Sequence, residues 1–211
     1  MKNNLVFIGI FLLITLILTG CLKQEKNMGP TQNLSLADKK VVLVIAFQGF
    51  QDQEYNQTRK VLEDQGAKIT VASWSTGMAQ GKFGSSVKVD KSIEEINAAD
   101  FEAIVFVGGP GAADYFGNKT AHRLAQEAVA QNKVLAAICI APAILAKAGV
   151  LKGKKATVWS APFDRGSVEI LKTEGAEYLD QPVVVDGKIV TANGPSAAEE
   201  FGRAIVEALV R

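Results

Sequence analysis

The chain has 211 residues, with 23 Lys and Arg against 22 Asp and Glu, and 48% of its residues are hydrophobic. This composition supports a packed core and excludes a chain that is disordered throughout. A formal charge of +1 gives no basic surface for phosphates, and one His with two Cys excludes zinc fingers and multi-His metal sites. We therefore expect neither nucleic-acid binding nor a structural metal.

The N-terminus has the layout of a secretory signal. Lys2 precedes an uncharged run over residues 5–18, which is shorter than the ~20 apolar residues of a spanning helix. The run ends in Leu-Thr-Gly-Cys at 18–21, which is similar to the lipobox of prokaryotic lipoproteins. We predict a signal peptide over 1–20, lipidation of Cys21 and an extracytoplasmic protein anchored to the cell membrane. The alternative is an uncleaved anchor helix, which also places the rest of the chain at a membrane surface.

The segment that follows is polar. From Leu22 to Asp38 it is rich in Lys, Gln, Asn and Ser, contains Gly29 and Pro30, and has few apolar residues to bury. Such a composition is typical of a flexible tether. The sequence therefore predicts a polar tether over 21–38 and one domain over 39–211.

Apolar runs and helical patterns alternate along the predicted domain. Strands are predicted at 41–46, 68–73, 103–107, 134–138, 156–159, 183–185 and 189–191, and helices at 55–65, 120–131, 167–173 and 196–210. Between the second and third strands, closely spaced glycines indicate a β-ribbon over 78–89. Strands that alternate with helices predict an α/β domain with a mostly parallel sheet covered on both faces.

Three of the apolar strands end in polar or glycine-rich segments, at 48–54, 108–111 and 139–140. In open α/β sheets the chemistry lies at the carboxyl ends of the strands. Cys139 stands between a buried strand and a helix start at Pro142, a pattern typical of a nucleophile elbow. There a helix N-terminus favours the thiolate, and Gly108-Gly109 can lend a backbone N–H to an oxyanion.

A structural role is the alternative for Cys139. A free Cys is most often a small buried hydrophobe, and no His lies near it in the sequence. Lipidation of Cys21 would leave Cys139 without a disulfide partner, and a lone thiol outside the cytosol favours a reactive role. Glu54, beside the start of the helix at 55–65, stabilises that helix end whatever else it does.

Five short motifs occur in a fixed order: Phe-Gln-Asp-Gln-Glu at 50–54, Phe-Val-Gly-Gly at 106–109, Ala-Ile-Cys at 137–139, Ala-Gly-Val-Leu-Lys-Gly at 148–153, and Val-Asp-Gly-Lys-Ile-Val-Thr at 185–191 before Gly-Pro at 194–195. Together they resemble the DJ-1/PfpI family, which is also classed with cysteine peptidases, from about Lys39 to the C-terminus. The resemblance implies a flavodoxin-like three-layer sandwich, usually dimeric. It also implies that Cys139 is the reactive thiol and that Glu54 hydrogen-bonds it, with no metal and no cofactor.

Such a carboxyl can take or share the proton of the thiol and leave a nucleophilic sulfur near neutral pH. The chain nevertheless departs from the family pattern. Protease-like members have His directly after the Cys, where this chain has Ile140, and DJ-1-like members have a His in the segment matching 159–162, which has none. Val107 replaces the usual Pro, a change that bears on turn geometry. The single histidine, His122, matches neither position and is expected to be a solvated helix residue.

Three functions of different classes follow. The resemblance implies an enzyme for small reactive carbonyls, of glyoxalase or deglycase type: Cys139 adds to the aldehyde, Glu54 moves the proton, and the N–H groups of Gly109 and Ile140 hold the oxygen. A cysteine peptidase is disfavoured because it needs an imidazole, unless a neighbouring subunit supplies one. A non-catalytic redox sensor or chaperone-like module would instead use oxidation of Cys139. The expected partners are a small-molecule substrate, a second copy in a homodimer and a membrane, but no nucleic acid.

Overall fold

The computed structural model describes residues 35–211. The predicted signal peptide, Cys21 and the tether up to residue 34 lie outside the described residues. Leu36, within the predicted tether, is fully buried, and its N–H donates to the carbonyl of Gln65 at 2.6 Å. The packed body therefore begins before residue 39, because this apolar side chain joins the core.

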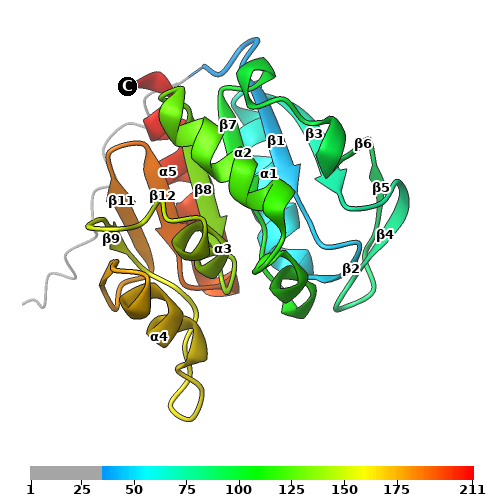
Figure 1. Ribbon diagram of the computed structural model, residues 1–211. Coiled ribbons are helices and arrows are strands. Elements are labelled where there is room, and N and C mark those ends of the chain that lie inside the picture. The colour runs from blue at the N-terminus through cyan, green and yellow to red at the C-terminus, as the bar shows by residue number, and fades with distance from the viewer. Residues whose placement is uncertain (1–34) are drawn as a thin grey trace, which may run out of the picture. The chain divides into compact units, whose positions relative to one another are not determined.

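A seven-stranded sheet forms the centre of the body, in the order β11-β12-β8-β7-β1-β3-β6 (Figure 1). Every neighbouring pair is parallel except β11 and β12, which are antiparallel. The mostly parallel sheet predicted from the sequence is confirmed. The strands are β1 (Lys40–Val44), β3 (Lys68–Ser73), β6 (Lys91–Ser92), β7 (Ala103–Phe106), β8 (Val134–Ile138), β11 (Val183–Asp186) and β12 (Ile189–Ala192).

Helices cover both faces of this sheet, so the body is a three-layer sandwich (Figure 1). In β1, Val41 and Leu43 belong to the buried cluster that includes side chains of α1 and α5, whereas Val42 and Val44 belong to the cluster with α2, α3 and α4. This alternation is the period of two expected of a strand with a core on each side. The helices are α1 (Asp52–Asp64), α2 (Lys119–Ala130), α3 (Pro142–Lys147), α4 (Gly166–Thr173) and α5 (Ala198–Val210).

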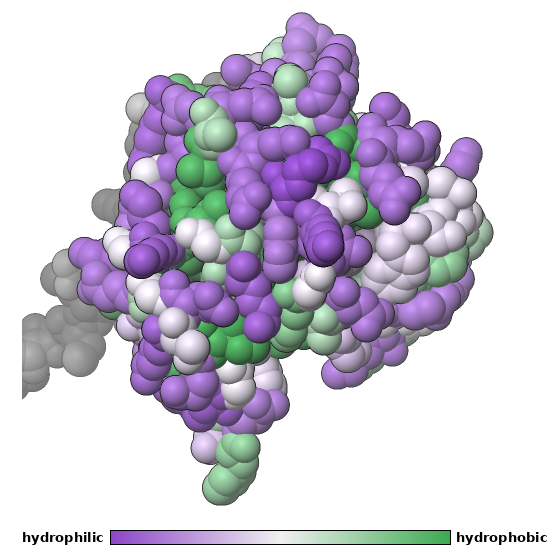
Figure 2. All heavy atoms as spheres, viewed as in Figure 1, coloured by the Kyte–Doolittle hydropathy of each residue, from purple (hydrophilic) through white to green (hydrophobic). Residues whose placement is uncertain are grey.

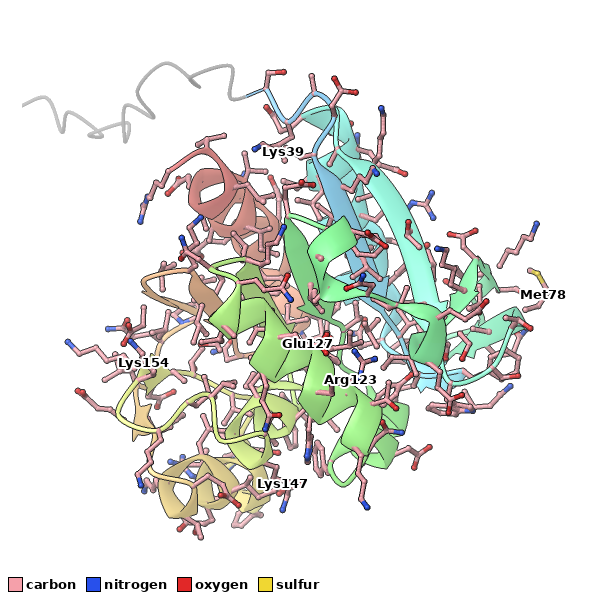
Figure 3. All side chains as sticks on the ribbon, turned by 45° about the horizontal axis from the view of Figure 1, so that its top comes forward. Lys39, Met78, Arg123, Glu127, Lys147 and Lys154 are labelled. Carbon is pink, nitrogen blue, oxygen red and sulfur yellow. The ribbon has the colours of Figure 1, made fainter. Side chains whose placement is uncertain are left out.

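The predicted β-ribbon is present as β4 (Gly77–Gly81) and β5 (Ser86–Val89), which pair antiparallel. A further strand, β2 (Gln48–Phe50), pairs with β4 and makes a small sheet of three strands. The ribbon stands at the side of the body, where Met78 extends into solvent and is 51% exposed (Figure 3). β2 thereby connects the ribbon to the segment that leads into α1.

The smaller elements differ from the predictions. The strand predicted at 156–159 is reduced to β9 (Lys155–Ala156), which pairs with β10 (Glu177–Tyr178), because the chain then turns back toward the end of β8. Short 3-10 helices occupy Ile93–Glu95, Ala98–Asp100, Pro110–Tyr115 and Pro195–Ala197. Within residues 35–211, no helix is both long and apolar enough to cross a membrane.

Candidate active site

Cys139 lies at the turn between β8 and α3. Its φ angle of 64° is in the left-handed region, which residues other than Gly rarely occupy. Its N–H donates to the carbonyl of Ala192 at 2.9 Å, and its carbonyl accepts from the N–H of Trp159 at 2.8 Å. A strained backbone of this kind costs about 1–3 kcal/mol and persists only where the surroundings hold it. The predicted strand–turn–helix elbow is therefore present, and two hydrogen bonds to other segments fix it.

Glu54 reaches the same region from the first turn of α1. The side chain of Gln51 accepts from the N–H of Glu54 at 3.1 Å and so caps the helix, which begins three residues before the predicted start. The Glu54 side chain is fully buried, and its Oε2 accepts from the N–H of Gly108 at 3.0 Å. Oε1 has no hydrogen-bond partner among the described residues. The carboxyl is thus held at one oxygen and free at the other.

Gly108 lies where the thiol and the carboxyl meet. A Cβ at this position would be 2.4 Å from the Cβ of Cys139 and 2.6 Å from Oε2 of Glu54. The next residue, Gly109, has a φ of 101°, and a Cβ there would be 2.4 Å from the carbonyl oxygen of Gly49. Only glycine fits these two places, so the glycine pair allows Glu54 and Cys139 to approach each other.

The two acidic groups influence each other's pKa. Burial raises the pKa of Glu54 to about 7, although the Cys139 thiol and the N–H of Gly108 lower it. Burial and the negative charge of Glu54 raise the pKa of the Cys139 thiol to about 12, against the N–H groups of Gly109 and Ile140. Above about pH 7 the pair therefore holds one negative charge, and it gains a second only in strongly alkaline solution.

The single charge can reside on either group. A thiolate beside a protonated Glu54 has the same total charge as a thiol beside a carboxylate. Proton transfer from Cys139 to Glu54 thus produces a nucleophilic sulfur without placing two charges in the core. Loss of the thiol proton to solvent is the unfavourable route, because burial and Glu54 oppose it.

The structure brings together all the site residues predicted within the described region: Glu54, Gly108, Gly109, Cys139 and Ile140. The N–H groups of Gly109 and Ile140 lower the pKa of the Cys139 thiol, which places both close to its sulfur. The family model named DJ-1/PfpI family matches residues 39–208.

The chain belongs to the DJ-1/PfpI family. It is similar to an uncharacterized protein of Methanocaldococcus jannaschii, with 41% identity over 94% of this chain and 95% of that protein. Deglycase PfpI of Pyrococcus furiosus is 33% identical over 80% of this chain and 98% of its own length. The crystal structure of a ThiJ/PfpI domain protein from Brachyspira murdochii has a TM-score of 0.77 and 34% identity, covering 81% of this chain and 95% of that chain.

The single histidine of this DJ-1/PfpI chain is not part of the site. His122 lies in α2, as predicted, and is half-buried rather than fully solvated; its Nε2 bonds the carbonyl of Phe116 at 3.0 Å. It is not among the groups that shift the pKa of Glu54 most strongly. Among residues 35–211, no three His, Cys, Asp or Glu side chains gather as a metal site requires.

The sequence did not reveal three residues that shape the site of this DJ-1/PfpI chain. Trp159 bonds the backbone of Cys139, as described above, and Gln53 donates from Nε2 to the carbonyl of Pro195 at 3.1 Å. Asp52 accepts from the N–H groups of Phe83 at 2.8 Å and Ser85 at 2.7 Å. All of these partners are distant in sequence, so no local pattern indicates them.

Proposed function

We propose that this DJ-1/PfpI protein is a cofactor-independent cysteine enzyme acting on small reactive carbonyl compounds, of glyoxalase or deglycase type. The observation that carries the proposal is a buried Glu54 carboxyl, with a pKa of about 7, against the Cys139 thiol. At neutral pH this carboxyl can accept a proton and return it, as general acid–base catalysis requires. The name of the Pyrococcus furiosus relative, a deglycase, agrees with this assignment.

The first chemical step joins the Cys139 sulfur to the aldehyde carbon. The thiol gives its proton to Glu54, the S–C bond forms, and the electron pair of the carbonyl moves to its oxygen. The N–H groups of Gly109 and Ile140, which lower the pKa of the thiol, would hold that oxygen. Glu54 then passes the proton to the oxygen, and the product is a hemithioacetal.

With a 2-oxoaldehyde, the second step moves hydrogen within the substrate. Glu54 removes the proton from the aldehyde carbon, and the electron pair moves to the neighbouring carbonyl, whose oxygen takes up a proton to give an enediol. The hydroxyl group on the first carbon then loses its proton and becomes the thioester carbonyl, while Glu54 returns the first proton to the second carbon. The first carbon is oxidised to a thioester while the second is reduced to an alcohol, so no external oxidant is needed. Water hydrolyses the thioester, which releases a 2-hydroxy acid and restores the thiol.

A peptidase is less well supported. Attack on a peptide bond requires a proton for the leaving amine, and cysteine peptidases commonly supply it from an imidazole. The chain contains one histidine, and that imidazole bonds the carbonyl of Phe116. Ile140 directly follows Cys139, where protease-like members have a histidine, and the segment 159–162, where DJ-1-like members have one, contains none.

The proposed function is tested by turnover of methylglyoxal to lactate by the full chain. Cys139→Ala should abolish turnover, and Glu54→Gln should reduce kcat at least 100-fold, the lower range for loss of a general acid–base group. Glu63→Gln, on the exposed part of the same helix, should leave kcat unchanged. Turnover by the parent no faster than by Cys139→Ala would refute the enzyme. Stable oxidation of Cys139 without turnover would then favour the redox sensor.

We also propose a lipid-anchored, extracytoplasmic homodimer. The support for anchoring is the Leu-Thr-Gly-Cys sequence at 18–21, followed by a polar segment that separates it from the domain. The support for the dimer is the family, whose members are usually dimeric. Sedimentation of the purified protein should give twice the mass of one chain, and a monomer would refute the dimer.

A further inference from the structure

Two half-buried apolar side chains, Ile140 and Trp159, lie on segments next to Cys139. Ile140 follows it directly, and the segment of Trp159 is held beside it by the backbone bond to the Cys139 carbonyl at 2.8 Å. Both side chains are half-buried and pack against the buried cluster that contains Cys139. A Cβ on Gly194 would lie 3.5 Å from Cδ1 of Trp159, so the indole lies against Gly194, which follows β12.

The two polar side chains that precede Glu54 in α1, Asp52 and Gln53, are engaged elsewhere. The Asp52 carboxylate bonds the ribbon, and the Gln53 amide bonds Pro195. Within residues 35–211, Glu54 is the charged side chain with the largest effect on the pKa of the Cys139 thiol, and burial, the thiol and the N–H of Gly108, but no cation, shift the pKa of Glu54. A substrate carboxylate or phosphate would therefore meet an anionic pair without a counter-charge.

Access to the thiol is narrow. Cys139 is only 8% exposed, so a substrate must present its carbonyl end first and leave the remainder against the neighbouring surface. Trp159, whose backbone bonds Cys139, has a half-buried indole, and aromatic side chains gain free energy mainly by burying apolar area.

We propose that the site selects carbonyl compounds whose non-reacting end is uncharged and apolar, and that Trp159 is a specificity-determining residue that packs against that end. The inference rests on the proposed function for its substrate class, but the selectivity itself is a property of access to Cys139. It can therefore be measured without turnover.

The first experiment is alkylation of Cys139 in the full chain, with mass spectrometry to separate it from Cys21. Rates for iodoacetamide, iodoacetate and 2-bromoacetophenone are each divided by the rate with free cysteine. We expect the normalised rate of iodoacetate to be at least tenfold below that of iodoacetamide, and the rate of 2-bromoacetophenone to be several-fold above it. Equal normalised rates for the three reagents would overturn the proposal.

Variants then test Trp159 itself. Trp159→Gln should reduce the normalised rate of 2-bromoacetophenone to that of iodoacetamide. Trp159→Phe keeps an aromatic ring and should retain the faster rate, so it separates loss of the ring from a folding defect. Phe163→Ser is the matched control, because this aromatic lies in the same loop but is 102% exposed; the apolar end of that loop projects at the lower edge of the molecule (Figure 2). A Trp159→Phe protein that is folded yet has lost the preference, or a Phe163→Ser protein that loses it, would contradict the assignment.

Turnover measurements distinguish the proposed enzyme activity from the proposed substrate selectivity. Phenylglyoxal and 4-carboxyphenylglyoxal differ only in a carboxylate, and kcat/KM for the first should exceed that for the second at least tenfold, the lower range for a pocket that discriminates between substrates. Equal kcat/KM values would overturn the inference and leave the enzyme intact. No turnover of either compound, with the alkylation preference preserved, would refute the enzyme and leave the selectivity standing.

Discussion

At the scale of single residues, Glu54 opposes the stability of the fold when it is charged. The carboxyl is protonated in the folded state up to a pKa of about 7, but in the unfolded chain only up to its ordinary value of 4.5. Between these values the folded state holds the extra proton, so stability falls as pH rises through this window. A pKa shift of this size lowers the free energy of unfolding by about 3 kcal/mol above pH 7. This is the loss of stability that comes with a buried titrating group beside Cys139.

Glu54→Gln should remove that pH dependence, because the amide does not titrate. The unfolding free energy of Glu54→Gln minus that of the parent should rise by about 3 kcal/mol from below pH 4.5 to above pH 7. Urea denaturation at several pH values measures this difference, and any fixed cost of the amide cancels between them. A difference that does not vary with pH would show that Glu54 ionises normally.

Gly108 provides a second test at this scale. Gly108→Ala places a methyl against both the thiol and the carboxyl, and overpacking of this kind costs about 1–3 kcal/mol. We expect alkylation of Cys139 at pH 7 to change more than tenfold, because Glu54 and Cys139 must separate. Gly117→Ala, where the added methyl meets nothing within 4 Å, is the control and should behave as the parent. Unchanged reactivity in a folded Gly108→Ala protein would exclude the close pair.

At the scale of elements, Asp52 ties the start of α1 to the turn between β4 and β5. Burial raises the pKa of Asp52, but the hydrogen bonds from Phe83 and Ser85 together lower it by more, so the pKa lies below the ordinary 3.8. The stability it contributes is present above the unfolded pKa and is lost as pH falls through the folded value. Because Glu54 is two residues later on the same helix turn, this tie also orients the carboxyl.

Asp52→Ala should therefore remove the hydrogen bonds that hold the β4–β5 turn to the start of α1. Hydrogen bonds to charged groups contribute about 1.5–3 kcal/mol, so we expect a loss of that order in the free energy of unfolding. Amide exchange should accelerate at Phe83 and Ser85, while the amides of β8 should keep their protection relative to global unfolding. Amide-exchange protection at Phe83 equal to that of the parent would show that Asp52 does not hold the ribbon.

Whether a helix or strand can be predicted from the sequence depends on which of its faces are buried. β8 begins and ends where its apolar run does, because both faces of the strand are in the core. β2 has only three residues and pairs with the ribbon alone, so no periodicity reveals it. α1 starts early because Gln51 caps it, a residue that seldom serves as a cap. The elbow at Cys139 could be predicted from its neighbours, whereas its pairing with Glu54 came from family resemblance, since tertiary structure alone joins the two segments.

At the scale of the whole molecule, the proposed anchor can be tested apart from the enzyme. Cys21→Ser should move the protein from the membrane to the soluble fraction, because the thiol that would carry the lipid is gone. The alkylation rate of Cys139 should not change. Firm membrane binding by Cys21→Ser would instead support an uncleaved anchor helix.

The position of β1 determines when the domain can fold. Among residues 35–211, β1 is the first strand to be synthesised, yet it lies inside the sheet between β3 and β7, and α5, which contacts α1, is the last helix. Pairing between such distant segments has to wait for the intervening chain and is slow to form. The face covered by α1 and α5 is complete only when nearly the last residue is available, so we expect the domain to fold late in its synthesis or after it. For the exported protein proposed above, such a delay would let the chain pass through the membrane before this face of the sheet closes.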